Sequence, residues 1–172
     1  MVLTFQECTL NDLEALIRIS RETFVSAFEQ ANDPMDFNDY LKKAFHPDKM
    51  ASELDDVHSF FYFVFEDEVL VGYFKLNLND SQTDIKNPNA VEIERIYVLE
   101  SHQGKQIGAW MLHQIIGLAK GMGKTFIWLG VWEENPKAIK FYQRHGFEKF
   151  DEHPYYIGTD KQTDWLLRLD LQ

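Results

Sequence analysis

The chain has 172 residues, with 17 lysines and arginines against 28 aspartates and glutamates, and its formal net charge at pH 7 is −11. This charge repels polyanions, so we expect no nucleic-acid ligand; it would concentrate a small cation at an acidic cleft, although many proteins are acidic only for solubility. There is no run of about 18 apolar residues and no leader pattern, so we expect no membrane partner and a cytoplasmic location. Cys8 is the only cysteine, which excludes an intrachain disulfide and fits a reducing compartment.

The apolar content, 45% of the residues, is enough for one sizeable core, and no Pro/Gly/Ser-rich linker divides the chain. We therefore predict a single domain over residues 1–172. Periodicity in the N-terminal third predicts a strand over 3–7 and helices over 13–28, 35–45 and 47–54. Asn11, with Glu14 three residues on, predicts the N-cap of the first helix.

A β-hairpin is predicted next, with an aromatic strand over 60–65, a polar turn over 66–68 and a returning strand over 69–78. A polar loop then leads to a strand over 91–98. Alternation along this strand predicts that one face is shared by Glu92, Glu94, Ile96 and Val98.

The remaining elements alternate between strand and helix. They are a helix from Gly108 to Gly121, an apolar strand over 125–132, a helix from Asn135-Pro136 to Gly146, and two paired antiparallel strands over 147–151 and 163–171. A strand–helix–strand connection of this length implies a right-handed crossover, so the strand over 125–132 is predicted to lie parallel to the strand over 91–98.

Residues 103–108 form a polar loop between the strand over 91–98 and the helix that follows. Gly104 and Gly108 expose the first turn of this helix, where backbone N–H groups have no intrahelical partner. A helix start of this kind attracts anions, so the sequence predicts an anion site beyond the strand end.

Two motifs stand on this framework. The first is the strand end Tyr97-Val98 with the loop Gln103-x-x-x-x-Gly108, and the second is Asn135-x-x-Ala138-x-x-Phe141-Tyr142-x-x-x-Gly146-Phe147. In order and placement they resemble the signature motifs of the GNAT superfamily of acetyl-CoA-dependent N-acetyltransferases. The resemblance implies an α+β GNAT fold, with a mixed, mostly antiparallel sheet and helices on both faces. Residues 92–97 and 128–133 further resemble the PaiA-type spermidine/spermine N-acetyltransferases of bacteria.

The resemblance implies that acetyl-CoA is the co-substrate and assigns residues to it. The pantetheine arm would lie between two splayed strands against the main chain of Ile96, Tyr97 and Val98. The pyrophosphate would lie on the loop and helix start, which comprise Gln103, Gly104, Lys105, Gln106, Ile107, Gly108 and Ala109. Asn135 is expected to contact the coenzyme, and Lys137 and Arg144 to meet a phosphate, unless these two cations lie on a solvated helix face. In the family a glycine stands where this chain has Gln106, so a positive φ there would be strained.

Amine acetylation requires a base for the ammonium proton and an acid for the departing thiolate. We expect Glu94 to be the base by resemblance to polyamine acetyltransferases, with Glu92 on the same strand as the alternative; both could instead be ordinary polar residues on a solvated face. Tyr142 is the expected general acid, unless it is simply a core tyrosine. The six histidines show no metal-ligand spacing, so no metal is expected.

The sequence therefore predicts direct transfer of the acetyl group from acetyl-CoA to a primary amine, with a small cationic polyamine such as spermidine or spermine preferred. Acidic residues between Glu29 and Asp39, with Trp132, Tyr155 and Tyr156, are candidates for contacts with such a cation. The alternatives are another amine, such as a protein N-terminus or an aminoglycoside-like compound, and a non-catalytic acetyl-CoA-binding regulator. The resemblance also implies a homodimer.

Overall fold

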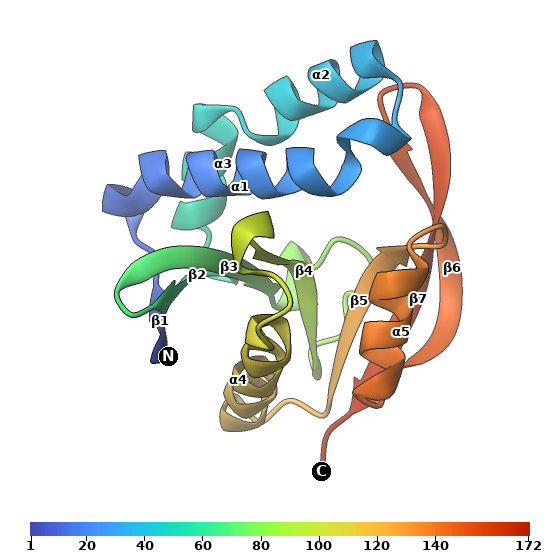
Figure 1. The fold of residues 1–172 in the computed structure, drawn as a ribbon. Helices are drawn as coiled ribbons and strands as arrows, with labels where there is room; N and C mark the ends of the chain where they lie inside the picture. The colour runs from blue at the N-terminus through green and yellow to red at the C-terminus, as the bar shows by residue number, and fades with distance from the viewer.

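The computed structural model describes all 172 residues. One seven-stranded sheet runs through the chain in the order β1-β2-β3-β4-β5-β7-β6, and only β4 and β5 pair in parallel (Figure 1). The strands are β1 (Leu3–Glu7), β2 (Ser59–Glu66), β3 (Val69–Asn77), β4 (Ala90–Val98), β5 (Phe126–Trp132), β6 (Glu148–Ile157) and β7 (Asp160–Asp170). The predicted mixed, mostly antiparallel sheet is thus confirmed.

Helices cover both faces of the sheet, as predicted. One face carries α1 (Leu13–Phe28), α2 (Pro34–Ala44) and α3 (Pro47–Asp55), and the other carries α4 (Ile107–Gly121) and α5 (Pro136–Arg144) (Figure 1). Short 3₁₀ turns lie at Leu10–Asp12, Glu29–Ala31, Asn79–Ser81 and Glu100–His102. None of the helices combines the length and the apolar composition that crossing a membrane would need.

Each face of the sheet has its own core. On the α4 side, Val91 and Ile93 of β4 pack in one cluster with Met111 and Ile115 of α4. A second cluster on the other face contains α1, α2 and α3 residues together with aromatic side chains of β2 and β3, such as the fully buried Tyr73. Burying a large apolar side chain contributes roughly 1.5–3 kcal/mol, so these two clusters hold β3 and β4 at the centre of the molecule.

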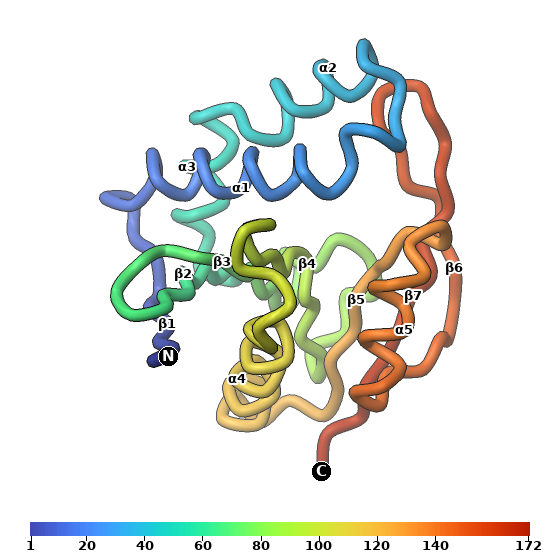
Figure 2. Tube along the Cα trace, viewed as in Figure 1, coloured from blue at the N-terminus to red at the C-terminus, as the bar shows by residue number.

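Two local predictions are corrected by the structure. The capping box is formed by Thr9 and Asp12 rather than by Asn11 and Glu14: the Thr9 N–H donates to Asp12 Oδ2 at 2.8 Å, and a 3₁₀ turn precedes α1. The last two strands are longer than predicted, because the β6–β7 hairpin extends until its tip lies beside α2 (Figure 2), where Thr159 Oγ1 donates to Asp36 Oδ2 at 3.0 Å.

Where β4 pairs with β3, the segment from Glu92 to Val98 contains one residue more than the segment from Gly72 to Asn77 that it faces. Arg95 pairs with Lys75, but the next pair is Ile93 with Leu76, so Glu94 is an inserted residue in a β-bulge. A bulge interrupts the alternation of side chains along a strand. The pattern read from the sequence is therefore wrong beyond this point.

After the bulge, Ile96 and Val98 lie on the α4 side together with Ile93, not on the side of Glu94. Tyr97 packs on the opposite side with the α1–α3 cluster. The Arg95 guanidinium is also on that side, 4.8 Å from the ring centre of Phe45. The bulge thus separates the acidic side chains of β4 from its apolar end.

β4 and β5 pair only at their beginnings. The parallel register joins Ala90 to Phe126, Val91 to Ile127 and Glu92 to Trp128, and no pair follows. The strands then diverge, as Figure 1 shows, so the second half of β4 has free main-chain groups on this side.

Candidate active site

A cleft of about 960 Å³ opens where β4 and β5 diverge. It is lined by the end of β4, the loop before α4, the end of β5 and one side of α5. The predicted site residues that line it are Glu94, Ile96, Tyr97, Val98, Gln103, Gly104, Gln106, Ile107, Gly108, Ala109, Asn135, Lys137, Tyr142 and Arg144. The side chains of Glu92 and Lys105 do not line it; Lys105 Nζ lies instead 3.4 Å from Glu66 Oε1.

The start of α4 offers backbone donors to this cleft. The first helical hydrogen bond is from the Trp110 N–H to the Gln106 carbonyl, at 3.1 Å, and the N–H groups of residues 104–109 donate to no acceptor in the chain. Gln103 Nε2 ties the loop to the strand end by donating to the Val98 carbonyl at 3.1 Å. Free amides at the positive end of a 15-residue helix fit a pyrophosphate, which supports the predicted anion site.

Gln106 adopts the conformation that the family glycine would take freely. Its φ of 65° and ψ of 16° are left-handed helical, directly before α4. Such a conformation costs a residue with a Cβ about 1–2 kcal/mol. The substitution therefore strains the loop while leaving its backbone donors in place.

The second motif lies on the opposite wall of the cleft. Asn135 Oδ1 accepts from the Ala138 N–H at 3.3 Å, so this side chain caps α5. Lys137 and Arg144 line the cleft and form no ion pair within the chain. Both cations are therefore free for a phosphate, as the resemblance implies, or for solvent.

Tyr142 of α5 also faces the cleft. Its ring packs edge-on against Phe141 and Phe147, with centroids 5.2 and 5.6 Å away. Burial raises the pKa of Tyr142, and its hydroxyl makes no hydrogen bond within the chain. The hydroxyl is thus a protonated donor with no partner.

A second cavity, of about 250 Å³, lies on the face of the sheet that carries α1 and α2. We call it the acceptor cavity. Its carboxylates are Asp84, Glu92, Glu94 and Asp164, and its cationic side chains are Arg95 and His153. It shares with the cleft a boundary formed by Phe24, Ile93, Glu94, Tyr97, Gly130, Tyr155 and Asp164. A ligand in the acceptor cavity can therefore meet a ligand in the cleft.

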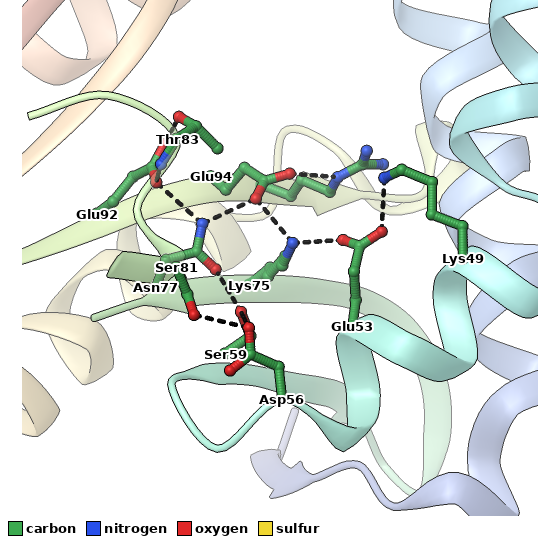
Figure 3. Close-up of polar contacts among 11 residues, drawn as sticks. Lys49, Glu53, Asp56, Ser59, Lys75, Asn77, Ser81, Thr83, Glu92 and Glu94 are labelled. Atoms are coloured by element: carbon green, nitrogen blue, oxygen red, sulfur yellow. Dashed lines mark hydrogen bonds and ion pairs between the residues drawn. The ribbon is translucent and has the colours of Figure 1, made fainter. Parts of the chain in front are cut away.

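Glu94 is part of a polar network that begins on α3 (Figure 3). Lys75 Nζ donates to Glu53 and, at 2.7 Å, to Glu94 Oε1, which also accepts from Asn77 Nδ2 at 2.8 Å. Burial alone would raise the pKa of Glu94, but Lys75 and Arg95 lower it to about 2. A carboxylate held in this way is a weak proton acceptor at neutral pH.

Glu92 supports the loop before β4. Its side chain is 3% exposed and accepts hydrogen bonds from Asn77 Nδ2 at 2.9 Å, from the Thr83 N–H at 2.8 Å and from the Thr83 hydroxyl (Figure 3). Burial raises the pKa of Glu92, although these hydrogen bonds oppose the shift. Glu92 borders the acceptor cavity and does not line the cleft.

Of the other candidates for a cation contact, only Tyr155 borders the acceptor cavity; its hydroxyl lies 2.6 Å from that of Tyr40. Trp132 lines the cleft, and Tyr156 is 54% exposed. The acidic residues between Glu29 and Asp39 line neither space.

Asp164 was not identified from the sequence. It borders both spaces, and it lies on the same face of β7 as the buried Leu166, two residues further on. That spacing was visible in the sequence, as was Gly130 within an otherwise apolar strand, where glycine often marks a close approach of another group.

Comparison with known proteins identifies the family. Residues 13–147 match the model of the acetyltransferase (GNAT) family. An uncharacterized N-acetyltransferase in the pepI 3′ region of Lactobacillus delbrueckii subsp. lactis is 40% identical over 157 residues, which cover 91% of each chain. The spermidine N(1)-acetyltransferase of Thermoplasma acidophilum is 22% identical over 155 residues, 88% of this chain and 91% of its own.

Solved structures agree on the fold. The PaiA N-acetyltransferase of Thermoplasma acidophilum, in complex with coenzyme A, superimposes with a TM-score of 0.79 over 99% of both chains at 20% identity. At 20% sequence identity this likeness shows a shared fold. The family model and the 40% identical relative each span most of the sequence, and they show that the chain belongs to the GNAT family of acetyltransferases.

Proposed function

We propose that this protein transfers the acetyl group of acetyl-CoA directly to a primary amine, and that the acceptor is a small polyamine such as spermidine or spermine. The observation that carries this proposal is the meeting of two spaces where β4 and β5 diverge: a cleft with free backbone donors and an acidic cavity. A direct transfer requires both substrates to be bound at once, and the shared boundary provides for this.

The cleft has the groups that acetyl-CoA requires. The N–H groups of residues 104–109 would hold the pyrophosphate, and the unpaired edge of β4 from Ile96 to Val98 would bond the pantetheine amides. Bound there, acetyl-CoA would supply the acetyl group as an activated thioester. The hydroxyl of Tyr142 would give its proton to the departing thiolate.

The acceptor cavity favours a cation. It has four carboxylates against one guanidinium and one histidine, and aromatic side chains such as Tyr40, Tyr155 and Trp128 complete its walls. Carboxylates and aromatic faces are the groups that bind alkylammonium ions. The likeness to a spermidine N(1)-acetyltransferase at 22% identity supports the same acceptor class.

An acceptor screen tests this proposal. The purified protein is incubated with acetyl-CoA and, in turn, with spermidine, spermine, an aminoglycoside and a peptide with a free N-terminus; released thiol is measured and products are identified by mass. We expect the polyamines to give the highest kcat/KM. Turnover confined to the peptide or the aminoglycoside would replace the polyamine with that acceptor. No turnover with any amine, while acetyl-CoA still raises Tm, would show a non-catalytic coenzyme-binding protein instead.

A further inference from the structure

An amine in the acceptor cavity can reach a thioester in the cleft only across their shared boundary. Two carboxylates lie on this boundary, Glu94 of β4 and Asp164 of β7. Either carboxylate is placed to contact the ammonium group. They differ in whether the carboxylate is already bonded to other groups of the protein.

Glu94 is already bonded within the protein. Its Oε1 accepts from Lys75 Nζ and Asn77 Nδ2, and its Oε2 lies 3.4 Å from Arg95 Nε. The carboxylate of Asp164 has no hydrogen bond or ion pair within the chain, and burial raises the pKa of Asp164 to about 6. A proton acceptor works best when its pKa lies near the operating pH, so Asp164 suits this role better than Glu94.

β5 makes room for this carboxylate. A Cβ built on Gly130 would lie 3.1 Å from Asp164 Oδ2 and 3.8 Å from Asp164 Cβ, so the carboxylate lies against the bare main chain of the strand. Glycine weakens a strand interior, and its presence there marks a close approach of another group. Gly130 itself lies on the shared boundary, so the space it leaves opens toward both substrates.

No cation of the protein neutralises Asp164. The charged groups that share its cavity are Glu92, Glu94 and Arg95 of β4, Asp84 of the preceding loop, and His153, its pairing partner on β6. Arg95 is held beside Glu94, and His153 is hydrogen-bonded to Asp84. Burial raises the pKa values of Tyr40, Tyr97 and Tyr155, so these neighbours stay neutral. Lys137, Lys140 and Arg144 of α5 line the cleft that Asp164 also borders, but none of them forms an ion pair with it, so the carboxylate has no bonded countercharge within the protein.

We propose that Asp164 is a catalytic residue that binds the acceptor ammonium at this boundary and removes a proton from it. The neutral amine attacks the thioester carbonyl carbon, the C–N bond forms and the C–S bond breaks. One ammonium proton passes to Asp164 and then to solvent. The departing thiolate takes the proton of the Tyr142 hydroxyl. The nitrogen then loses a second proton, which restores this hydroxyl, so the amide nitrogen keeps one proton. The inference rests on the proposed function, since it presumes an amine acceptor.

Asp164→Asn tests the assignment, with Asp170→Asn as the matched control. Asp170 lies on the same strand but is exposed and bonded to Arg168. We expect Asp164→Asn to lower kcat/KM for the amine at least about 100-fold, with the affinity for acetyl-CoA and Tm retained, and Asp170→Asn to match the wild type. Wild-type kcat/KM in Asp164→Asn would overturn the assignment and leave the proposed function standing. If no amine reacts even with the wild type, the proposed function fails and the assignment fails with it.

Two further measurements separate proton transfer from a structural role. The pH profile of kcat/KM should fall on the acid side near pH 6 in the wild type and in His153→Gln, but not in Asp164→Asn. Formate added to Asp164→Ala should raise the rate of this variant at least about tenfold, because formate replaces the missing carboxylate. An unchanged acid limb in Asp164→Asn together with no rescue by formate would contradict the role.

Discussion

The coenzyme cleft and the acceptor cavity meet at the divergence of β4 and β5, yet they are built from different groups. The cleft presents backbone N–H groups of residues 104–109, which donate to nothing within the chain. The acceptor cavity presents side chains, and three of its four carboxylates are already bonded within the protein: Glu94 to Lys75, Glu92 to Thr83, and Asp84 to His153. The backbone donors of the cleft are thus free for a ligand, whereas most carboxylates of the acceptor cavity are held by bonds within the protein.

This difference has a consequence for mutations. The charges around the acceptor cavity are tied to the fold, so removing one partner leaves another charge buried and unpaired. The donors of the cleft belong to the main chain, and most side chains there can change without loss of a bond. Removing a paired charge beside the acceptor cavity should therefore lower stability, whereas replacing a cleft side chain in unstrained backbone should mainly alter binding or rate.

Lys75→Met should have the largest effect. The Lys75 side chain is 5% exposed and neutralises both Glu53 and Glu94. Removing one partner of a buried ion pair costs about 3–5 kcal/mol of unfolding free energy. Urea unfolding measures the loss. Lys49→Met is the matched control, because Lys49 bonds the same Glu53 at 2.6 Å but is 53% exposed, and a surface pair contributes about 0–1 kcal/mol. Equal losses in the two variants would contradict the comparison.

Tyr142→Phe should leave stability unchanged and slow the reaction. The ring keeps its contacts with Phe141 and Phe147, and the hydroxyl that is lost bonds nothing in the chain. If this hydroxyl protonates the thiolate, kcat falls about 100-fold with KM for acetyl-CoA unchanged. Tyr156→Phe, at an exposed position, serves as the control. Unchanged kcat in Tyr142→Phe would make Tyr142 a packing residue only.

Low pH should reduce the contribution of Glu94 to the unfolding free energy. Its pKa is lowered from 4.5 to about 2, because Lys75 and Arg95 outweigh the effect of burial. A carboxylate whose pKa is lower in the folded state stabilises the protein at pH values above its ordinary pKa. This contribution is lost as pH falls from about 4.5 through about 2. The wild type should therefore exceed Glu94→Gln in unfolding free energy by about 2 kcal/mol at pH 6 and lose that advantage by pH 2.

Urea unfolding at several pH values measures this difference. Glu22→Gln, on the exposed side of α1, should instead stay parallel to the wild type. A gap between the wild type and Glu94→Gln that does not change with pH would mean that the Lys75 pair contributes nothing to folding.

The comparison also explains what the sequence could predict. Periodicity and turn residues predict nearly all elements, from the strand at residues 3–7 to the parallel arrangement of β4 and β5. The bulge at Glu94 was not predictable, because a two-residue alternation carries no sign of an inserted residue. Side-chain directions were therefore wrong beyond it, while the strand itself was right.

The loop and helix start that line the cleft were easier to predict than the acceptor cavity for a physical reason. A backbone site needs only the local conformation of one loop and one helix start, which a short motif such as residues 103–108 encodes. The acceptor cavity gathers Tyr40, Glu94 and Asp164, which are far apart in the sequence, and only the pairing of strands and the packing of α2 on the sheet bring them together. Glu94 was identified by resemblance, but its bonding to Lys75 was not visible in the sequence.

Gly108→Asp tests whether charge can be changed in the cleft without loss of stability. A Cβ at this position would lie 3.7 Å from Phe141 Cζ, an ordinary contact, and a carboxylate in the first turn of α4 is favoured by the helix dipole by about 0.3–1 kcal/mol. The same carboxylate repels a pyrophosphate, so KM for acetyl-CoA should rise at least about tenfold. Gly108→Ala should leave KM near the wild-type value. Unchanged KM in Gly108→Asp would place the pyrophosphate elsewhere.

Gln106→Gly should have the smallest effect and the opposite sign. Glycine adopts the left-handed conformation of residue 106 without strain, and part of the gain is offset by the greater freedom of glycine in the unfolded chain, so the unfolding free energy should rise by about 0.5–1 kcal/mol. Gln143→Gly, within the regular helix α5, should lose about as much. The donor at residue 106 is its backbone N–H, so the Kd for acetyl-CoA, measured by calorimetry, should change less than about twofold. A tenfold weaker Kd would show that the glutamine side chain itself binds the coenzyme, and the cleft would then depend on side chains as the acceptor cavity does.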